Sequence, residues 1–199
     1  MQKIGFNIDT IQQMGAPKDC LQRLIKNKKT ITEFESCSLS LSNATKKDLK
    51  AVKLIEGKEF KRNPQFGWFV ANASLLNQVH NQRVSALKRE DCSLYILKNK
   101  IGTVKGYFGF YTHMHPVFGP LAGPEFVFDK SIQGKGLSTM AYKILLEDMV
   151  KAKVKFLSGH TSQIGVFKNA KSMCRVPVNF ALRHSPGYFG KKYFNKFIN

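Results

Sequence analysis

The chain has 199 residues, of which 43% are hydrophobic, and this length fits one domain with a substantial buried core. No stretch approaches the roughly 18 consecutive apolar residues of a membrane span, and residues 1–11 lack the apolar centre of a signal peptide. The four cysteines are scattered without a CxxC pair, which favours free thiols over disulfides or a metal site. We therefore expect a cytoplasmic protein without a bound metal.

The net charge of +19 predicts attraction to polyanions such as nucleic acid or phosphorylated cofactors. Lysine outnumbers arginine by 26 to 6, however, and the lysines are spread along the chain. Sites that clamp phosphates or read bases favour arginine. Nucleic-acid binding therefore stays open but is not the favoured interpretation.

The first 29 residues carry apolar side chains at helical spacing on both sides of an Ala-Pro pair, and they predict an N-terminal helical extension. Residues 30–41 alternate apolar and polar side chains, which predicts a half-buried strand. A helix is then expected to begin with Asn43 or Thr45 as its cap and Asp48 in its first turn.

After a second helical region, the pattern changes at residue 92 to a hairpin, which is followed by strands and helices in turn. The elements expected here are a helical region 68–80, a hairpin of strands 92–97 and 101–111, a Pro- and Gly-rich loop 113–124, a strand 125–128, a helix 137–151, a strand 154–160, a helix 163–173 and a last strand 178–183. This order predicts an α+β or mixed α/β domain, residues 30–199, around one sheet.

The strongest functional signal is the turn between strand 125–128 and helix 137–151. A glycine-bearing turn at this place points several backbone N–H groups at one spot, beside the positive end of the helix dipole. Such a spot binds phosphate. The turn reads Gln133-Gly134-Lys135-Gly136-Leu137-Ser138-Thr139.

Two common phosphate motifs do not match this turn. A P-loop needs a glycine five residues before Gly134, where Asp129 stands, and a dinucleotide fingerprint needs a third glycine, where Thr139 stands. The turn resembles the (Q/R)xxGx(G/A) signature of the GNAT superfamily of acyl-CoA N-acyltransferases, with Gln133 and Gly136 in the first and fourth places. Ser138 stands in the sixth place, where the family prefers glycine or alanine, but serine is also a small residue.

The surroundings extend the resemblance to roughly residues 30–183. Residues 43–49 are similar to the family's usual "R-x-A-x-x-x-D-L" entry, and the hairpin at 92–111 has the expected place and length. The resemblance implies a mixed, mostly antiparallel central sheet flanked by helices. It also implies an N-acyltransferase that uses acyl-CoA, by expectation acetyl-CoA, as co-substrate and needs no metal.

The resemblance further implies a set of cofactor contacts. The amides of the turn would bind the pyrophosphate of coenzyme A, and the pantetheine arm would lie where strand 125–130 parts from strand 154–160. The residues implied are Phe126, Val127, Phe128, Gln133, Gly134, Lys135, Gly136, Leu137, Ser138, Thr139 and Asn169.

Direct transfer to a primary amine needs a group that takes a proton and a group that returns one to the thiolate. Many relatives place a carboxylate base on the strand before the glycine turn, and Glu125 stands there. The tyrosine acid usual in the family is absent from helix 163–173. Ser172, Cys174, a tail tyrosine such as Tyr188, or solvent stay open for that role.

The acceptor is expected to be a small-molecule or macromolecular amine, and the protein a monomer or homodimer. The alternative function is a non-catalytic, basic GNAT-like module that binds nucleic acid or another polyanion. Its contact segment would be the tail 187–199, in which aromatic residues alternate with lysines.

Overall fold

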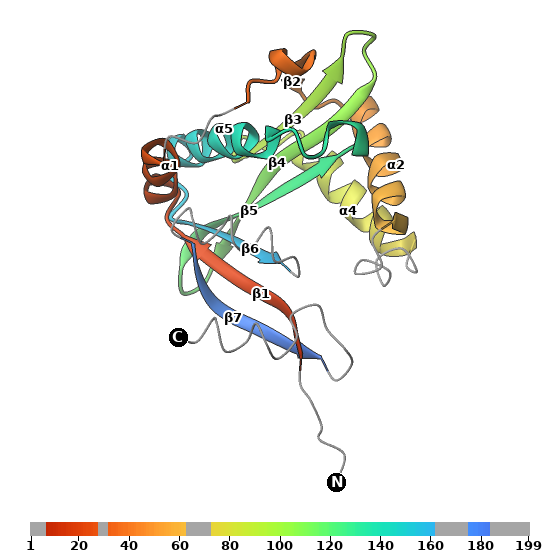
Figure 1. Ribbon diagram of the computed structural model, residues 1–199. Helices are drawn as coiled ribbons and strands as arrows, with labels where there is room; N and C mark the ends of the chain where they lie inside the picture. The colour runs from red at the N-terminus through yellow and green to blue at the C-terminus, as the bar shows by residue number, and fades with distance from the viewer. Residues whose placement is uncertain (1–6, 28–31, 63–72, 162–174, 184–199) are drawn as a thin grey trace.

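The computed structural model describes residues 7–27, 32–62, 73–161 and 175–183. The described strands form one seven-stranded sheet in the order β2-β3-β4-β5-β6-β1-β7 (Figure 1). Neighbouring strands are antiparallel except β5 and β6, which are parallel. The strands are β1 Asn7–Gly15, β2 Leu39–Asn43, β3 Cys92–Asn99, β4 Val104–His115, β5 Gly119–Phe128, β6 Phe156–Thr161 and β7 Val176–Arg183.

Four α-helices in the described ranges cover the two faces of this sheet. They are α1 Pro17–Lys26, α2 Lys46–Arg62, α4 Ala73–Ala86 and α5 Leu137–Lys151, with 3-10 turns η1 Glu35–Cys37 and η3 Lys130–Ile132. Helices α1 and α5 bury their apolar residues against one face, and α2 packs against the opposite face (Figure 1). The expected mixed, mostly antiparallel architecture is confirmed.

The predicted cap of α2 is also confirmed. Thr45 and Asp48 form a reciprocal capping box: the Thr45 N–H donates to Asp48 Oδ2 over 3.0 Å, and the Asp48 N–H donates to Thr45 Oγ1 over 3.3 Å. Burial opposes ionisation of Asp48, but hydrogen bonds from Thr45 and Lys98 outweigh burial and lower its pKa. The helix therefore begins where the sequence places it.

The helix expected in the first half of the N-terminal segment is wrong. Residues Asn7–Gly15 form strand β1, which lies inside the sheet and pairs antiparallel with β6 on one side and β7 on the other. Its apolar residues also suit a strand, because Ile and Thr favour extended backbone, and pairing on both edges overrides a weak helical spacing. The helix expected after the Ala-Pro pair is confirmed as α1.

Two further boundaries differ from expectation. Residues Glu35–Cys37 form a 3-10 turn, so the strand expected over 30–41 is only Leu39–Asn43. The loop expected over 113–124 is wrong, because β4 runs to His115 and β5 starts at Gly119. The prolines of β5 are tolerated because β5 pairs with β6 at only two positions, so few N–H donors are needed on that edge.

The main irregularity of the sheet is that β5 and β6 pair at only two positions and then separate. Leu121 pairs with Phe156 and Ala122 with Leu157, and no described strand pairs with that edge of β5 from Gly123 onward. On its other edge β5 pairs with β4 at all ten positions from Gly119 to Phe128. One edge of a rigidly held strand therefore keeps backbone groups that β6 does not use.

The predicted hairpin, the helix over 137–151 and the last strand are confirmed as β3–β4, α5 and β7. The helix expected over 163–173 lies outside the described residues. Within the described ranges, no helix is both long and apolar enough to cross a bilayer.

A truncation experiment can test whether β1 stabilises the sheet between β6 and β7. Deleting residues 1–15 removes the strand that joins β6 to β7, so we expect a large fall in the thermal unfolding temperature and loss of amide protection in β6. Deleting only residues 1–6 leaves β1 in place and serves as the control. Equal unfolding temperatures for the two variants would contradict the role given to β1.

Candidate functional site

The glycine turn lies between η3 and α5. The side chain of Asp129 caps η3 by accepting a hydrogen bond from the Ser131 N–H over 3.0 Å. Gly134 and Gly136 both have left-handed backbone conformations, with φ of +76° and +77°, and Gly136 is the cap residue of α5. Residues with a side chain rarely adopt this conformation, so the turn needs glycine at both places.

The turn presents backbone donors to its surroundings. The first N–H groups of an α-helix have no acceptor within the helix, and in the described part of the chain no backbone carbonyl accepts from Gly134, Lys135 or Gly136. Residues 133–136 are exposed. These donors and the helix dipole together form a place that suits an anion.

The side chain of Gln133 fixes the turn in position. Its Nε2 donates to the Phe128 carbonyl oxygen over 2.7 Å and to Glu59 Oε2 over 3.0 Å. These two bonds tie the turn to the end of β5 and to α2. The first residue of the signature is thus a structural clamp in this chain.

The strand residues expected near the cofactor arm face opposite sides of the sheet. Phe126 and Phe128 pack into the cluster under α5, where the Phe126 ring stacks on Tyr142 with 5.1 Å between centroids. Val127 packs into the cluster on the opposite face. Where β5 and β6 separate, these three residues therefore present backbone N–H and C=O groups, because their side chains pack into the two clusters.

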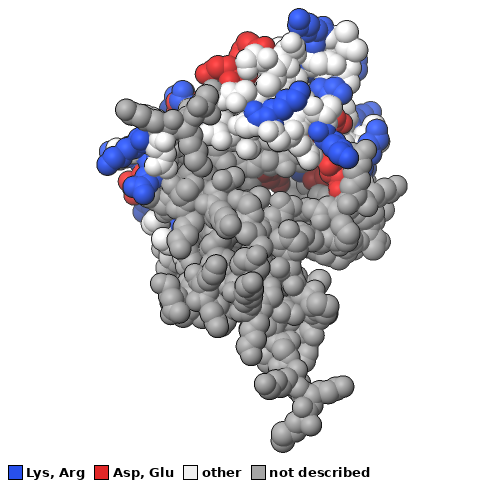
Figure 2. All heavy atoms as spheres, in the orientation of Figure 1, with Lys and Arg blue, Asp and Glu red and all other residues white. Residues whose placement is uncertain are grey.

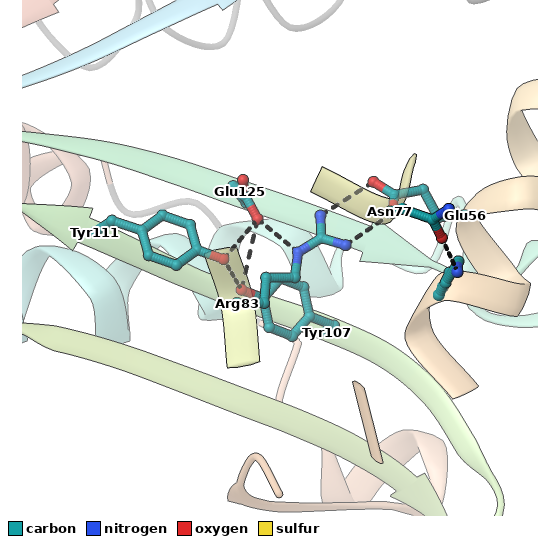
Figure 3. Close-up of polar contacts among 7 residues, drawn as sticks. Glu56, Asn77, Arg83, Tyr107, Tyr111 and Glu125 are labelled. Carbon is teal, nitrogen blue, oxygen red and sulfur yellow. Dashed lines mark hydrogen bonds and ion pairs between the residues drawn. The ribbon is translucent and has the colours of Figure 1, made fainter. Parts of the chain in front are cut away.

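Glu125 lies on the same strand and accepts a converging set of hydrogen bonds (Figure 3). Its Oε2 atom accepts from Arg83 Nε over 3.0 Å and from Tyr111 Oη over 3.2 Å, and Tyr107 Oη lies 3.5 Å away. The side chain is 31% exposed. Among the described residues, no donor reaches Oε1, so one oxygen is held and the other is available.

Arg83 on α4 joins this carboxylate to a second one. Its Nη1 and Nη2 donate to the two oxygens of Glu56 on α2, over 2.7 and 3.0 Å, and the guanidinium lies 4.9 Å from the centre of the Tyr107 ring (Figure 3). The side chain of Arg83 is 3% exposed. Burial opposes its charge, but Glu56 and Glu125 outweigh burial and raise its pKa.

The two tyrosines act as donors at neutral pH. Burial, and then the charge of Glu125, raise the pKa of Tyr107 and of Tyr111 above the usual value. Their hydroxyls are 2.8 Å apart. The group thus consists of two carboxylates, one guanidinium and two neutral phenols.

The cluster of Arg83, Glu56, Tyr107 and Tyr111 was not predicted from the sequence. Ser172, Tyr188 and Asn169, which were predicted, lie outside the described residues. Ser138 and Thr139 lie in the first turn of α5, after the buried Leu137. No group of three metal-ligating side chains occurs in the ranges that the structure describes.

Another buried cation lies on the α5 side of the sheet. Arg175, just before β7, is 5% exposed; its Nη1 donates to Tyr142 Oη over 2.5 Å and its Nη2 to the Gln13 carbonyl oxygen over 3.3 Å. These bonds connect α5, β1 and β7, and we assign Arg175 a structural role.

The similarity of this chain to known proteins is seen in its three-dimensional structure. No family model and no curated protein matches this chain. The structure is similar to a GCN5-related N-acetyltransferase from Ralstonia eutropha JMP134, with a TM-score of 0.54 and 12% identity over 67% of this chain and 90% of the other. The chain has the GNAT fold.

Two more solved structures support this assignment. A predicted acetyltransferase with acetyl-CoA from Clostridium acetobutylicum has a TM-score of 0.54 and 10% identity, over 67% of this chain and 86% of its own. A tandem GNAT protein from the clavulanic acid biosynthesis pathway has a TM-score of 0.57 and 16% identity, over 91% of this chain and 55% of its own. The resemblance stated from the glycine turn is confirmed at the level of the fold.

The glycine turn of this GNAT fold can be tested by alanine substitution. Gly134→Ala meets no atom within 4 Å but keeps a positive φ, so we expect a loss of about 1 kcal/mol in unfolding free energy. Gly136→Ala adds a contact of 3.0 Å with Thr32 Oγ1 and should lose more. Gly57→Ala, inside α2, is the control and should gain up to about 1 kcal/mol. Chemical denaturation measures all three, and losses at Gly134 and Gly136 no larger than at Gly57 would contradict the geometry.

The buried ion cluster gives a second test. Arg83→Met leaves two carboxylates without their cation, so we expect a loss of about 3–5 kcal/mol in unfolding free energy. Adding Glu56→Leu removes the more buried charge and should restore part of that loss. Arg89→Met removes an exposed ion pair with Asp91 and should lose at most about 1 kcal/mol. If Arg83→Met and Arg89→Met have equal effects on denaturation, the cluster is not the strong constraint described.

Proposed function

We propose that the protein is a cytoplasmic acyl-CoA-dependent N-acyltransferase, with acetyl-CoA as donor and a primary amine as acceptor. The observation that carries this proposal is the parting of β5 from β6 beside a glycine turn with unused backbone donors, on a GNAT fold. A similar solved structure is described with acetyl-CoA. The free thiols of Cys37 and Cys92 fit a reducing compartment.

The donor half of the site would use backbone groups. The N–H groups of residues 134–138 would bind the pyrophosphate, because the helix dipole and Lys135 add positive charge there. The edge of β5 from Gly123 to Phe128 would pair with the amides of the pantetheine arm, since β6 leaves that edge open. Binding of this kind depends on backbone shape, so Ser138 in place of a smaller residue is compatible with it.

The acceptor half would use Glu125 as general base. Its Oε2 is held by Arg83 and Tyr111, which leaves Oε1 to take a proton from the attacking amine, directly or through water. The amine nitrogen then bonds to the thioester carbonyl carbon, the C–S bond breaks, and the thiolate takes a proton. Ser172, Cys174, Tyr188 and solvent stay proposals for that last proton.

A basic module that binds polyanions is the second candidate, and the net charge of +19 favours it. Figure 2 shows Lys and Arg spread over the described part of one face, with acidic atoms between them. Nucleic-acid sites instead gather their positive charge along one groove or stripe. We therefore rank this function second.

Calorimetry with acetyl-CoA separates the two functions. We expect micromolar binding to the full chain and loss of binding in Gly136→Leu, because a side chain there must adopt a positive φ and blocks close approach of the pyrophosphate. Gly57→Leu, on α2, controls for a change of the same size elsewhere. No binding of acetyl-CoA, together with salt-sensitive binding of RNA, would overturn the enzyme and support the module.

The role of Glu125 is tested by Glu125→Gln in a panel of primary amines, with release of free thiol as the readout. We expect kcat to fall about 10²–10⁴-fold for the best acceptor, with the affinity for acetyl-CoA unchanged. Glu90→Gln removes an exposed carboxylate elsewhere and should leave kcat unchanged. Equal kcat in the Glu125 variant and the wild type would remove Glu125 from the mechanism.

A further inference from the structure

A basic hollow lies at the end of the sheet next to the glycine turn. It has a volume of about 350 Å³ and is bounded by the end of η1, the start of β2, the β3–β4 turn and η3. Three lysines line it, Lys100 and Lys105 from the β3–β4 hairpin and Lys135 from the glycine turn, and no carboxylate lines it. In Figure 1 these elements meet at the end of the sheet opposite to β1 and β7.

Two of the three lysines around the hollow have no acidic partner among the described residues, and the third has a distant one. The nearest ion pair is a long one, in which Lys105 Nζ lies 3.9 Å from Asp129 Oδ1. That same oxygen already accepts hydrogen bonds from the Ser131 N–H and hydroxyl. Lys100 and Lys135 are exposed and make no ion pair with the described residues. Positive charge therefore exceeds negative charge around a space that can hold an anion.

The remaining lining is suited to an organic group. Leu39 and Ile132 are buried and form apolar wall, and Ile101 on the hairpin tip is 84% exposed. Ser131 lies at the same edge, with its hydroxyl and its N–H both donating to Asp129 Oδ1. A volume of about 350 Å³ exceeds what a bare phosphate needs and lies within the range of small-molecule sites.

We propose that this hollow binds a phosphomonoester, with its phosphate among Lys100, Lys105 and Lys135 and its organic part against Leu39 and Ile101. The carboxylate cluster around Glu125 packs on the opposite face of the sheet, under α2, so the hollow is separate from the proposed acceptor position. Lys135 belongs to both the hollow and the glycine turn. A ligand at the turn and a phosphate in the hollow would therefore be neighbours.

The phosphate can come from two sources. It can be the 3′-phosphate of coenzyme A, in which case this arm rests on the proposed function and one molecule occupies both the turn and the hollow. It can also belong to a separate phosphomonoester that binds beside the cofactor. The chemistry is the same, and the affinities of CoA, 3′-dephospho-CoA and inorganic phosphate distinguish the two.

Calorimetry on the full chain tests the proposal with the double variant Lys100→Ala/Lys105→Ala. If the 3′-phosphate is the source, wild type binds CoA about tenfold more tightly than 3′-dephospho-CoA, and the double variant loses most of that difference. If the source is separate, CoA and 3′-dephospho-CoA bind equally, and inorganic phosphate binds wild type saturated with 3′-dephospho-CoA but not the double variant. Either result supports the site.

The control is Lys18→Ala/Lys88→Ala, which removes the same charge from exposed positions on α1 and after α4. Lys100→Glu, a change at an exposed turn, should weaken phosphate binding further without loss of folding, as circular dichroism would show. The proposal is overturned if the hollow variants and the control change all three affinities alike. Phosphate binding that depends on Lys100, without any binding of CoA, would keep this site and remove the proposed function.

Discussion

The geometry of the candidate site depends on one constraint, the way in which β5 is held. Strand β4 pairs with β5 along all ten of its residues, while β6 pairs only at Leu121 and Ala122. The strand is therefore rigid, yet its second edge keeps backbone donors and acceptors from Gly123 onward. The glycine turn follows directly on this edge, and its position is fixed by Gln133 through the Phe128 carbonyl. An extended ligand with phosphate at one end fits this combination.

Carboxylates and lysines gather at different places on the sheet. On the face under α2, Glu56 and Glu125 share Arg83, and both carboxylates lie in one network with two phenols. At the end of the sheet, beside the turn, lysines line a hollow that has no carboxylate in its wall. In a chain with 32 basic and 13 acidic residues, such a local concentration of carboxylates is the exception. In the proposed function, this cluster would give the amine acceptor a negative partner despite the overall positive charge.

Part of this arrangement could be predicted from the sequence because it is local. The capping box of Thr45 and Asp48 and the glycine turn before α5 are set by neighbouring residues. Strand β1 could not be predicted in this way, because its pairing with β6 and β7 joins residues more than 140 positions apart. The sequence does not predict the Glu125 cluster, because its proline and glycine residues predict a loop over 113–124. With β4 and β5 as one hairpin, Glu125 faces Gly109, and Tyr107 and Tyr111 flank that position.

The proposed function requires that coenzyme A lie along the free edge of β5 and on the amides of the turn. Hydrogen–deuterium exchange of the full chain, with and without CoA, tests this claim directly. We expect slower exchange in residues 123–128 and 134–138 when CoA binds, and little change in α1 and in β2. Binding of CoA that leaves exchange in both of these segments unchanged would contradict it.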